Sequence, residues 1–377
     1  MIRETGNADK QGPMRNAQES ARAPRVSAER LAELARHVTE RDREIALCLY
    51  QQQLLATDQL TLLFFSSKRR AQDRLLFLYR QRVLDRFYPP SRFGAGKAQA
   101  HWLLDEAGAQ LVAALLGVER KRLGWQRRDD WASHRQLAHR LEVNRFVTDL
   151  VAATLTDQTL AVRAWSGPRA AAERLEQRVR PDAALLLQTA AGAVIECYLE
   201  WDRATEPGER LAEKIARYRI AERKLRYHDR EPRSILFVVP GEGRLETLRR
   251  LPAPGSDDGH PALGRWPILA TTVPALRRDE PLRPIWVCID RPGEPPRALT
   301  ELPARSDLPA ADQRLALGRR WRHDQPGFWE RLSPLARPLS DAMQDRELSV
   351  TDRDLRSAAI NGSMDAREDD VEEELWP

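Results

Sequence analysis

Two carboxylates lie on neighbouring segments that the sequence predicts to be adjacent strands. Asp182 begins the first predicted strand, residues 182–188, and Glu200 ends the second, residues 193–200, after a turn of small residues. The first strand is nearly all apolar and the second alternates, which is typical of a sheet with at least one covered face. Adjacent strands can carry both carboxylates to one edge, where Mg²⁺, which takes hard oxygen ligands, would be held. A metal there can activate water for attack on a phosphodiester.

This spacing resembles the PD-(D/E)xK nuclease signature. Pro181 and Asp182 match its first half, and residues 200–202, Glu-Trp-Asp, stand where the second half has Glu, any residue and Lys. Asp202 therefore puts an anion at the position of the water-orienting lysine. Lys214 offers a substitute, because it lies at the edge of the apolar stripe of the next predicted helix and can point back to the carboxylates. The resemblance implies a catalytic set of Asp182, Glu200, Asp202 and Lys214, with Asp182 and Glu200 as the metal ligands.

The same residues also support an interpretation without cleavage. Lys214 can pair instead with Asp202 or Glu206, which lie between it and the second strand. Mg²⁺ is then not needed, and the domain keeps a nuclease-like fold that binds DNA without cutting it. Both interpretations stay open at this point.

Composition points to a cytoplasmic protein with a polyanionic partner. The chain has 377 residues, of which 42% are hydrophobic and 31% charged, and its formal net charge is +5. The stretch from Asp341 onward is acidic, so the remainder is more basic than the total, as expected for a nucleic-acid-binding body. No apolar run reaches the ~20 residues of a membrane-spanning helix, and the N-terminus lacks the apolar core of a signal peptide. The three separated cysteines favour reduced, buried thiols.

Residues 39–117 are predicted to form a winged helix-turn-helix. Thr39, Thr57 and the Ser66-Ser67 pair each begin a short helix, and two predicted strands then flank a turn rich in Pro, Gly and Arg. In this fold the third helix enters the major groove of DNA, and the hairpin, or wing, contacts the flanking backbone. The residues expected to contact DNA are Lys68, Arg69, Arg70, Gln72 and Arg74 on the third helix and Arg92 and Lys97 on the wing.

The fold class predicted for the whole chain is α+β or α/β, with a winged helix-turn-helix followed by a restriction-endonuclease-like (PD-(D/E)xK-like) α/β domain. Helix and strand patterns alternate after residue 133, and both termini have the polar, low-hydrophobic composition of disordered segments. The predicted divisions are 1–26, a disordered N-terminus; 27–117, the winged helix-turn-helix; 118–132, a basic connector; 133–290, the nuclease-like domain; 291–338, a proline-rich linker with a short docked segment; and 339–377, an acidic disordered tail.

Several segments, taken in order, resemble the replication-relaxation family of bacterial plasmids and integrative elements. The resemblance spans about residues 41–290, with two departures: Arg82 replaces a glycine expected before the first wing strand, and Trp201 replaces a smaller apolar residue after Glu200. It implies DNA binding in the replication or relaxation of a mobile element. The matching segments are RLLFLYRQRVLDRF, HWLLDEAGAQLVAALLG, HRLEVNRFVTDLVAA, RPDAALLL, YLEWDRATEP, EKIARY and ILFVVP.

Three functional hypotheses follow. In the first, the chain is a DNA-binding accessory that grips double-stranded DNA through the winged helix, with a replication initiator or relaxase as a further partner, while the nuclease-like domain does not cut. In the second, the chain is a Mg²⁺-dependent endonuclease that nicks DNA with Asp182 and Glu200. In the third, it is a transcription repressor of its element, which requires a dimer and a palindromic site.

Overall fold

The computed structural model describes residues 26–88, 99–128, 131, 136–205, 207–225, 232–251, 266–291 and 293–305. Contacts divide the chain into two units, Met1–Val38 and Thr39–Pro377. In the first unit, helix α1 spans Ala28–His37, and the Ser27 side chain accepts a hydrogen bond from the backbone N–H of Arg30. Serine is a favoured N-cap residue, because its side-chain oxygen can accept a hydrogen bond from a backbone N–H of the first turn.

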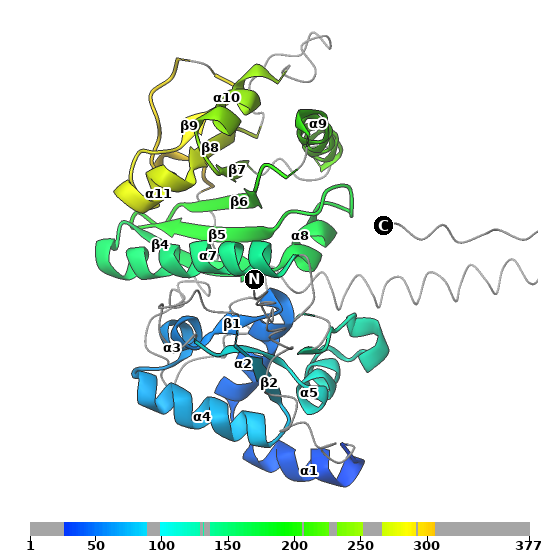
Figure 1. The fold of residues 1–377 in the computed structure, drawn as a ribbon. Coiled ribbons are helices and arrows are strands. Elements are labelled where there is room, and N and C mark those ends of the chain that lie inside the picture. Colours follow the sequence, from blue (N-terminus) through cyan, green and yellow to red (C-terminus); the bar gives the residue numbers. More distant parts are fainter. Residues whose placement is uncertain are drawn as a thin grey trace, which may run out of the picture. The chain divides into compact units, whose positions relative to one another are not determined.

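The N-terminal part of the second unit, residues 39–123, is called the head here. It combines helices (Figure 1) with a three-stranded antiparallel sheet of order β1-β3-β2. Strand β1, which the sequence did not predict, pairs with β3 and lies between the first two helices of the head in the chain. The elements are α2 (Glu40–Gln52), β1 (Leu55–Ala56), α3 (Thr57–Phe64), α4 (Lys68–Arg80), β2 (Leu84–Phe87), β3 (His101–Leu104), α5 (Glu106–Leu116) and the 3-10 helix η1 (Arg120–Leu123).

Local capping signals explain where the helices of the head begin and end. Thr39 and Asp42 form a reciprocal capping box at the start of α2, and the Ser67 side chain accepts a hydrogen bond from the Arg70 N–H at the start of α4. Asp105 caps α5, which ends at Gly117 in the left-handed conformation at φ +65°. These caps satisfy backbone groups that a helix end leaves unpaired.

The remainder of the second unit, residues 137–305, is called the body and is built on a six-stranded mixed sheet of order β4-β5-β6-β7-β8-β9. Strands β4, β5 and β6 are antiparallel neighbours, β6, β7 and β8 run parallel, and β9 is antiparallel to β8. The strands are β4 (Leu160–Ser166), β5 (Ala183–Thr189), β6 (Val194–Trp201), β7 (Arg233–Val239), β8 (Ile268–Thr272) and β9 (Val287–Cys288).

Helices cover both faces of this sheet. Tyr198 packs in one apolar core with residues of three helices, α8, α9 and α10. Trp201, three residues further along β6, faces the other side because side chains alternate along a strand, and there it contacts Phe146 of α7. The helices of the body are α7 (Leu137–Asp157), α8 (Pro168–Arg174), α9 (Gly208–Leu225), α10 (Glu242–Arg250), α11 (Val273–Asp279) and the 3-10 helix η2 (Leu299–Glu301).

Buried hydrogen bonds join the head to the body. The Gln52 side-chain amide donates to the carbonyl of Trp165 at 3.0 Å, and the Asn144 amide donates to the carbonyl of Gln52 at 3.1 Å. Gly167 lies so close to the carbonyl of Gln51 that a side chain there would clash with it. The predicted division at residues 118–132 stays a prediction, because head and body belong to one contact unit.

Two further predictions concern the C-terminal side and the cysteines. Residues 293–305, which belong to the predicted linker, are attached to the sheet through bridges between Val194 and Arg305 and between Trp286 and Arg297. The rest of the linker and the predicted acidic tail lie outside the described residues. Cys48, Cys197 and Cys288 are free and buried, as predicted.

Candidate functional site

Strand register brings Asp182 and Glu200 together at one end of the sheet. Ala183 of β5 pairs with Leu199 of β6, and the Asp182 N–H donates to the Leu199 carbonyl at 3.0 Å. Asp182 therefore lies opposite Glu200, and side chains directly opposite in an antiparallel pair lie on the same face, about 5 Å apart at Cβ. These two residues are called the carboxylate pair here.

Glu200 is almost fully buried, with 1% of its surface exposed, and both of its carboxylate oxygens have donors from α9. The Tyr218 hydroxyl donates to Oε1 at 2.6 Å, and the Lys214 ammonium forms an ion pair with Oε2. Lys214 and Tyr218 are four residues apart and so share one face of the helix. Lys214 thus reaches the carboxylate pair through Glu200. Glu206, one of its two alternative partners expected from the sequence, lies outside the described residues.

The electrostatic surroundings of Glu200 raise the pKa of its carboxyl group to about 7. Burial is the largest cause, because it penalises the charged form, and the nearby negative charge of Asp182 acts in the same direction. The Lys214 ammonium and the Tyr218 hydroxyl oppose this shift without cancelling it. Glu200 therefore changes charge near neutral pH.

Asp182 is held by the first turn of α7 and by the end of β6. His139 Nε2 lies 2.7 Å from Oδ1, and because an ionised carboxylate only accepts, Nε2 is assigned the proton. The Trp201 N–H donates to Oδ2 at 2.8 Å, and the Arg140 guanidinium donates to the Asp182 carbonyl at 3.0 Å. Burial acts to raise the pKa of Asp182, but His139, Lys214 and Arg140 outweigh it and hold that pKa below its usual value.

Every oxygen of the carboxylate pair thus has a donor from the chain itself. Mg²⁺ binds through free carboxylate oxygens and keeps several waters, so a cation at this site would have to displace the Lys214 ammonium or the Tyr218 hydroxyl from Glu200. In the part of the chain that the structure describes, no cluster of three or more His, Cys, Asp or Glu side chains has the arrangement of a metal site. The donor set seen here does not fit a bound Mg²⁺.

Asp202 lies just beyond β6 and turns to different partners. Its Oδ2 forms an ion pair with Arg244 of α10, and its Oδ1 accepts a hydrogen bond from the Ala204 N–H at 2.7 Å. These contacts do not involve the carboxylate pair, so Asp202 is placed as a link between β6 and α10 and not as a third carboxylate of the site.

The first turn of α4 presents basic side chains to solvent. Lys68, Arg69, Arg70 and Gln72 are all exposed, whereas Ala71, Leu75 and Leu78 of the same helix are buried. Among the described residues, no ion pair involves Lys68, Arg69 or Arg70. Arg92 and Lys97, the two basic residues expected on the hairpin, lie outside the described residues.

Unlike Lys68, Arg69 and Arg70, Arg74 forms an ion pair within the described part of the head. Its guanidinium pairs with Asp42 of α2 through two hydrogen bonds, one of them 2.9 Å long from Nε to Oδ1, and it lies over the ring of Phe77. Asp42 is fully buried and also caps α2. From the sequence, Arg74 was expected to contact DNA. In the structure its guanidinium instead links α4 to α2.

A second buried charge cluster lies on β6 at the face that carries Glu200. Glu196, with 2% of its surface exposed, forms ion pairs with Arg174 of α8 at 2.7 Å and with Arg233 of β7 at 3.2 Å. The Tyr198 hydroxyl also donates to it at 3.2 Å. Glu196 stands in the alternating pattern of its strand, but its partners come from α8 and β7, so the sequence alone does not reveal this cluster.

The fold defines a mixed α/β protein with a helical, three-stranded head and a six-stranded body that contains a buried carboxylate pair. Residues 47–231, about half of the chain, match the family described as Replication-relaxation, and this segment belongs to that family. Membership suggests a role in the replication or relaxation of mobile elements. No significant match was found among curated proteins or among solved structures. No helix within the described ranges is long and apolar enough to cross a membrane.

The raised pKa of Glu200 predicts a pH-dependent stability difference. The folded protein holds this proton up to about pH 7, whereas the unfolded chain releases it near pH 4.5. Between these values the folded state binds more protons, so the Glu200 contribution to stability falls as pH rises, by up to roughly 1.4 kcal/mol per pH unit. The E200Q variant lacks this titration. In urea unfolding at pH 5, 6, 7 and 8, the free energy of unfolding of E200Q should therefore rise relative to that of the wild type as pH rises.

Glu213 provides the matched control for this measurement. It lies on α9 like Lys214 and Tyr218, but its side chain is 67% exposed. E213Q should follow the wild type at every pH. A difference between E200Q and wild type that stays constant from pH 5 to pH 8 would contradict the raised pKa.

Proposed function

We propose that this chain is a DNA-binding accessory of mobile-element replication or DNA relaxation. In this proposal the head is a winged helix-turn-helix that grips duplex DNA, and the body is a nuclease-like frame that does not cut. The order α2, β1, α3, α4, β2, β3 supports the first part, because a winged helix has three helices followed by a hairpin. Family membership of residues 47–231 supports the setting.

The observation that carries the DNA-binding proposal is the exposed basic start of α4. Lys68, Arg69 and Arg70 follow the Ser67 cap, and no ion pair within the described residues engages them. Such side chains neutralise phosphates and release counterions, which makes binding strong at low salt and independent of sequence. The backbone N–H groups at the start of the same helix add donors for phosphate oxygens.

The body supports the non-cleaving part of the proposal in two ways. The order α7, β4, α8, β5, β6, α9, β7, with Asp182 just before β5 and Glu200 on β6, is consistent with the PD-(D/E)xK resemblance. A nuclease of this type uses its lysine to orient the attacking water and leaves the glutamate free to bind the metal. Here the Lys214 ammonium is bound directly to Glu200, so neither group is available for that role. The pair and its donors are therefore assigned a structural role at this end of the sheet.

Duplex binding by the full chain is the direct test of this proposal. Fluorescence anisotropy of a labelled 30-base-pair duplex should show binding at 50 mM salt that weakens steeply towards 200 mM, because phosphate contacts release counterions. Binding should rise further for DNA from the origin region of the element that encodes the chain. An anisotropy that stays flat at low salt for every duplex would refute the proposal.

A metal-dependent nicking enzyme is the second candidate function. The observation that favours it is that Asp182 and Glu200 lie opposite each other on one face, with the Lys214 ammonium at one of them. For this candidate, DNA or metal binding must first move Lys214 and Tyr218 away from Glu200. Its signature is nicking that both Asp182→Ala and Glu200→Ala abolish.

A further inference from the structure

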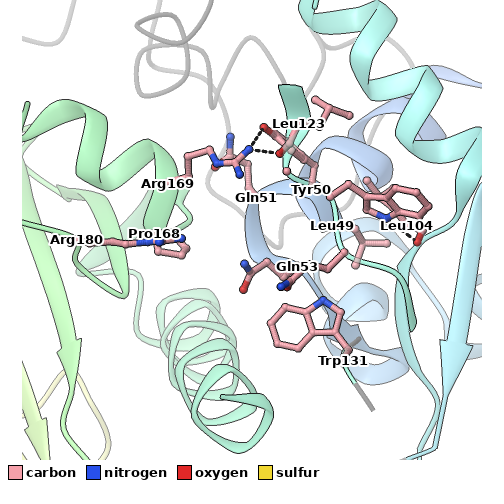
Figure 2. Close-up of a pocket in the computed structure, with 13 residues that line it drawn as sticks. Leu49, Tyr50, Gln51, Gln53, Leu104, Leu123, Trp131, Pro168, Arg169 and Arg180 are labelled. Carbon is pink, nitrogen blue, oxygen red and sulfur yellow. Dashed lines mark hydrogen bonds between the residues drawn. The ribbon is translucent and has the colours of Figure 1, made fainter. Parts of the chain in front are cut away.

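A positively charged cleft of about 310 Å³ lies where the end of α2, the 3-10 helix η1 and helix α8 meet. Tyr50, Leu123, Arg169 and Arg180 line it and also line an adjoining pocket (Figure 2). Arg122 contributes a further guanidinium to the cleft, and Glu173 contributes the one carboxylate among its described lining residues. The lining therefore carries three positive charges against one negative charge.

Arg169 is held in position at the wall of this cleft. Its Nη1 donates to the Tyr50 hydroxyl at 3.0 Å and to the carbonyl of Leu123, as Figure 2 shows. Gly124, at φ +57°, lies against its Nη2, and a side chain at that glycine would clash with the guanidinium. An arginine fixed in this way loses little conformational freedom on binding, and its planar fork of N–H donors matches the oxygens of a phosphate.

Arg180 connects the cleft to the carboxylate pair. Its side chain is exposed, and within the described residues it has no ion pair. It stands two residues before Asp182, and its positive charge acts on Arg140, which donates to the Asp182 carbonyl. A phosphate bound between Arg180 and Arg169 would therefore lie beside the end of the sheet where a nuclease would position its scissile strand.

We propose that this cleft binds a backbone phosphate of duplex DNA through Arg122, Arg169 and Arg180. This inference rests on the proposed function and adds to it a second phosphate contact, separate from α4. Arg127 and Arg128, further along the same segment, pair with Glu106 and Asp85, so the phosphate is assigned to the three arginines of the cleft itself. The body thus takes part in holding DNA beside a carboxylate pair that does not cut it.

Two cleft variants and one matched control test this inference in the full chain. Arg180→Ala and Arg122→Ala should each weaken binding of the labelled duplex about tenfold at 100 mM salt. Each should also lower the slope of log affinity against log salt by about 1, because one phosphate contact is lost. The control is Arg178→Ala, which removes an exposed arginine two residues before Arg180 that pairs with Glu176 outside the cleft. It should leave both quantities unchanged.

The outcomes distinguish DNA binding by the cleft from DNA binding by the head. If Lys68→Ala weakens duplex binding while Arg180→Ala and Arg122→Ala bind like the wild type, this inference is overturned and the proposed function stands. If the wild type binds no duplex, the proposed function fails as well. Thermal unfolding with 10 mM inorganic phosphate distinguishes the source of the anion in that case. A Tm rise in the wild type that Arg180→Ala lacks would assign the cleft to a small phosphate compound, and the DNA proposal would be overturned.

Discussion

Replacing Glu196 with glutamine is expected to lower the free energy of unfolding by about 3 to 5 kcal/mol. Glu196 is the shared partner of Arg174 and Arg233, and all three side chains are largely buried. Glutamine has nearly the same shape but no charge, so two largely buried guanidinium groups would lose the carboxylate that they share. The loss should appear as a lower urea midpoint with an unchanged m-value.

Lowering the pH should also reduce the free energy of unfolding of the wild type, because it protonates Glu196. Burial acts to raise the pKa of Glu196, but Arg174 and Arg233 outweigh it and lower that pKa to about 2. The folded pKa is below the unfolded value of 4.5, so the stabilisation is complete above pH 4.5 and is lost as pH falls towards 2. The E196Q variant should lack this component of acid unfolding.

Glu176 supplies the control for E196Q. It forms an ion pair with Arg178, but both side chains are well exposed, at 48% and 37%. Exposed pairs contribute at most about 1 kcal/mol, so E176Q should unfold almost like the wild type. A loss below 1 kcal/mol for E196Q would show that the two arginines do not depend on Glu196.

The second large effect is expected at the start of α4. Replacing Lys68, Arg69 and Arg70 together with alanine should weaken duplex binding about a hundredfold at 100 mM salt, since each phosphate contact contributes roughly 1 kcal/mol. The slope of log affinity against log salt should fall by about 2.7, which is 0.9 for each of three contacts. The three side chains are exposed and Ser67 still caps the helix, so the fold should be retained.

Arg80 provides a control on the same helix, because it is exposed in the last turn of α4. Arg80→Ala removes one positive charge, so it tests whether net charge alone explains the effect. It should change affinity by less than twofold. Arg74 is left out of the triple variant, because removing it would break the ion pair of buried Asp42 and would destabilise the head. Equal affinities of the triple variant and the wild type would contradict the assignment of α4 to DNA.

Much of the fold follows from local signals in the sequence. Thr39 and Ser67 mark helix starts that the structure confirms, because a cap depends only on neighbours three residues away. Strand β1 has two residues and exists only through its pairing with β3, so no local pattern indicates it. Helices α8 and α11 were missed because seven residues are too few for a clear apolar period.

The left-handed turn before β2 shows how a long-range contact can override a local expectation. The family resemblance predicts a glycine there, and Arg82 does adopt φ +60°, a conformation that glycine takes at least cost. The Arg82 guanidinium makes two hydrogen bonds to Asp105, at 3.1 and 3.2 Å. This pair offsets the strain, and the turn forms without glycine.

Part of the candidate site could be predicted from the sequence. Strand alternation and spacing located Asp182, Glu200 and Lys214, because register and helix period are regular. His139 was not recognised, since its contact with Asp182 joins residues 43 positions apart and depends on how α7 packs. Arg74 was assigned to DNA for the same kind of reason, because its partner Asp42 lies 32 positions away on another helix.

Incubation of supercoiled plasmid with the full chain and Mg²⁺ or Mn²⁺ tests the central claim most directly, since one gel reports both binding and cutting. The account predicts that the plasmid is retarded by the protein and, after the protein is removed, is recovered fully supercoiled. Open-circular plasmid formed by the wild type, and not by Asp182→Ala or Glu200→Ala, would contradict it and establish the carboxylate pair as a catalytic site.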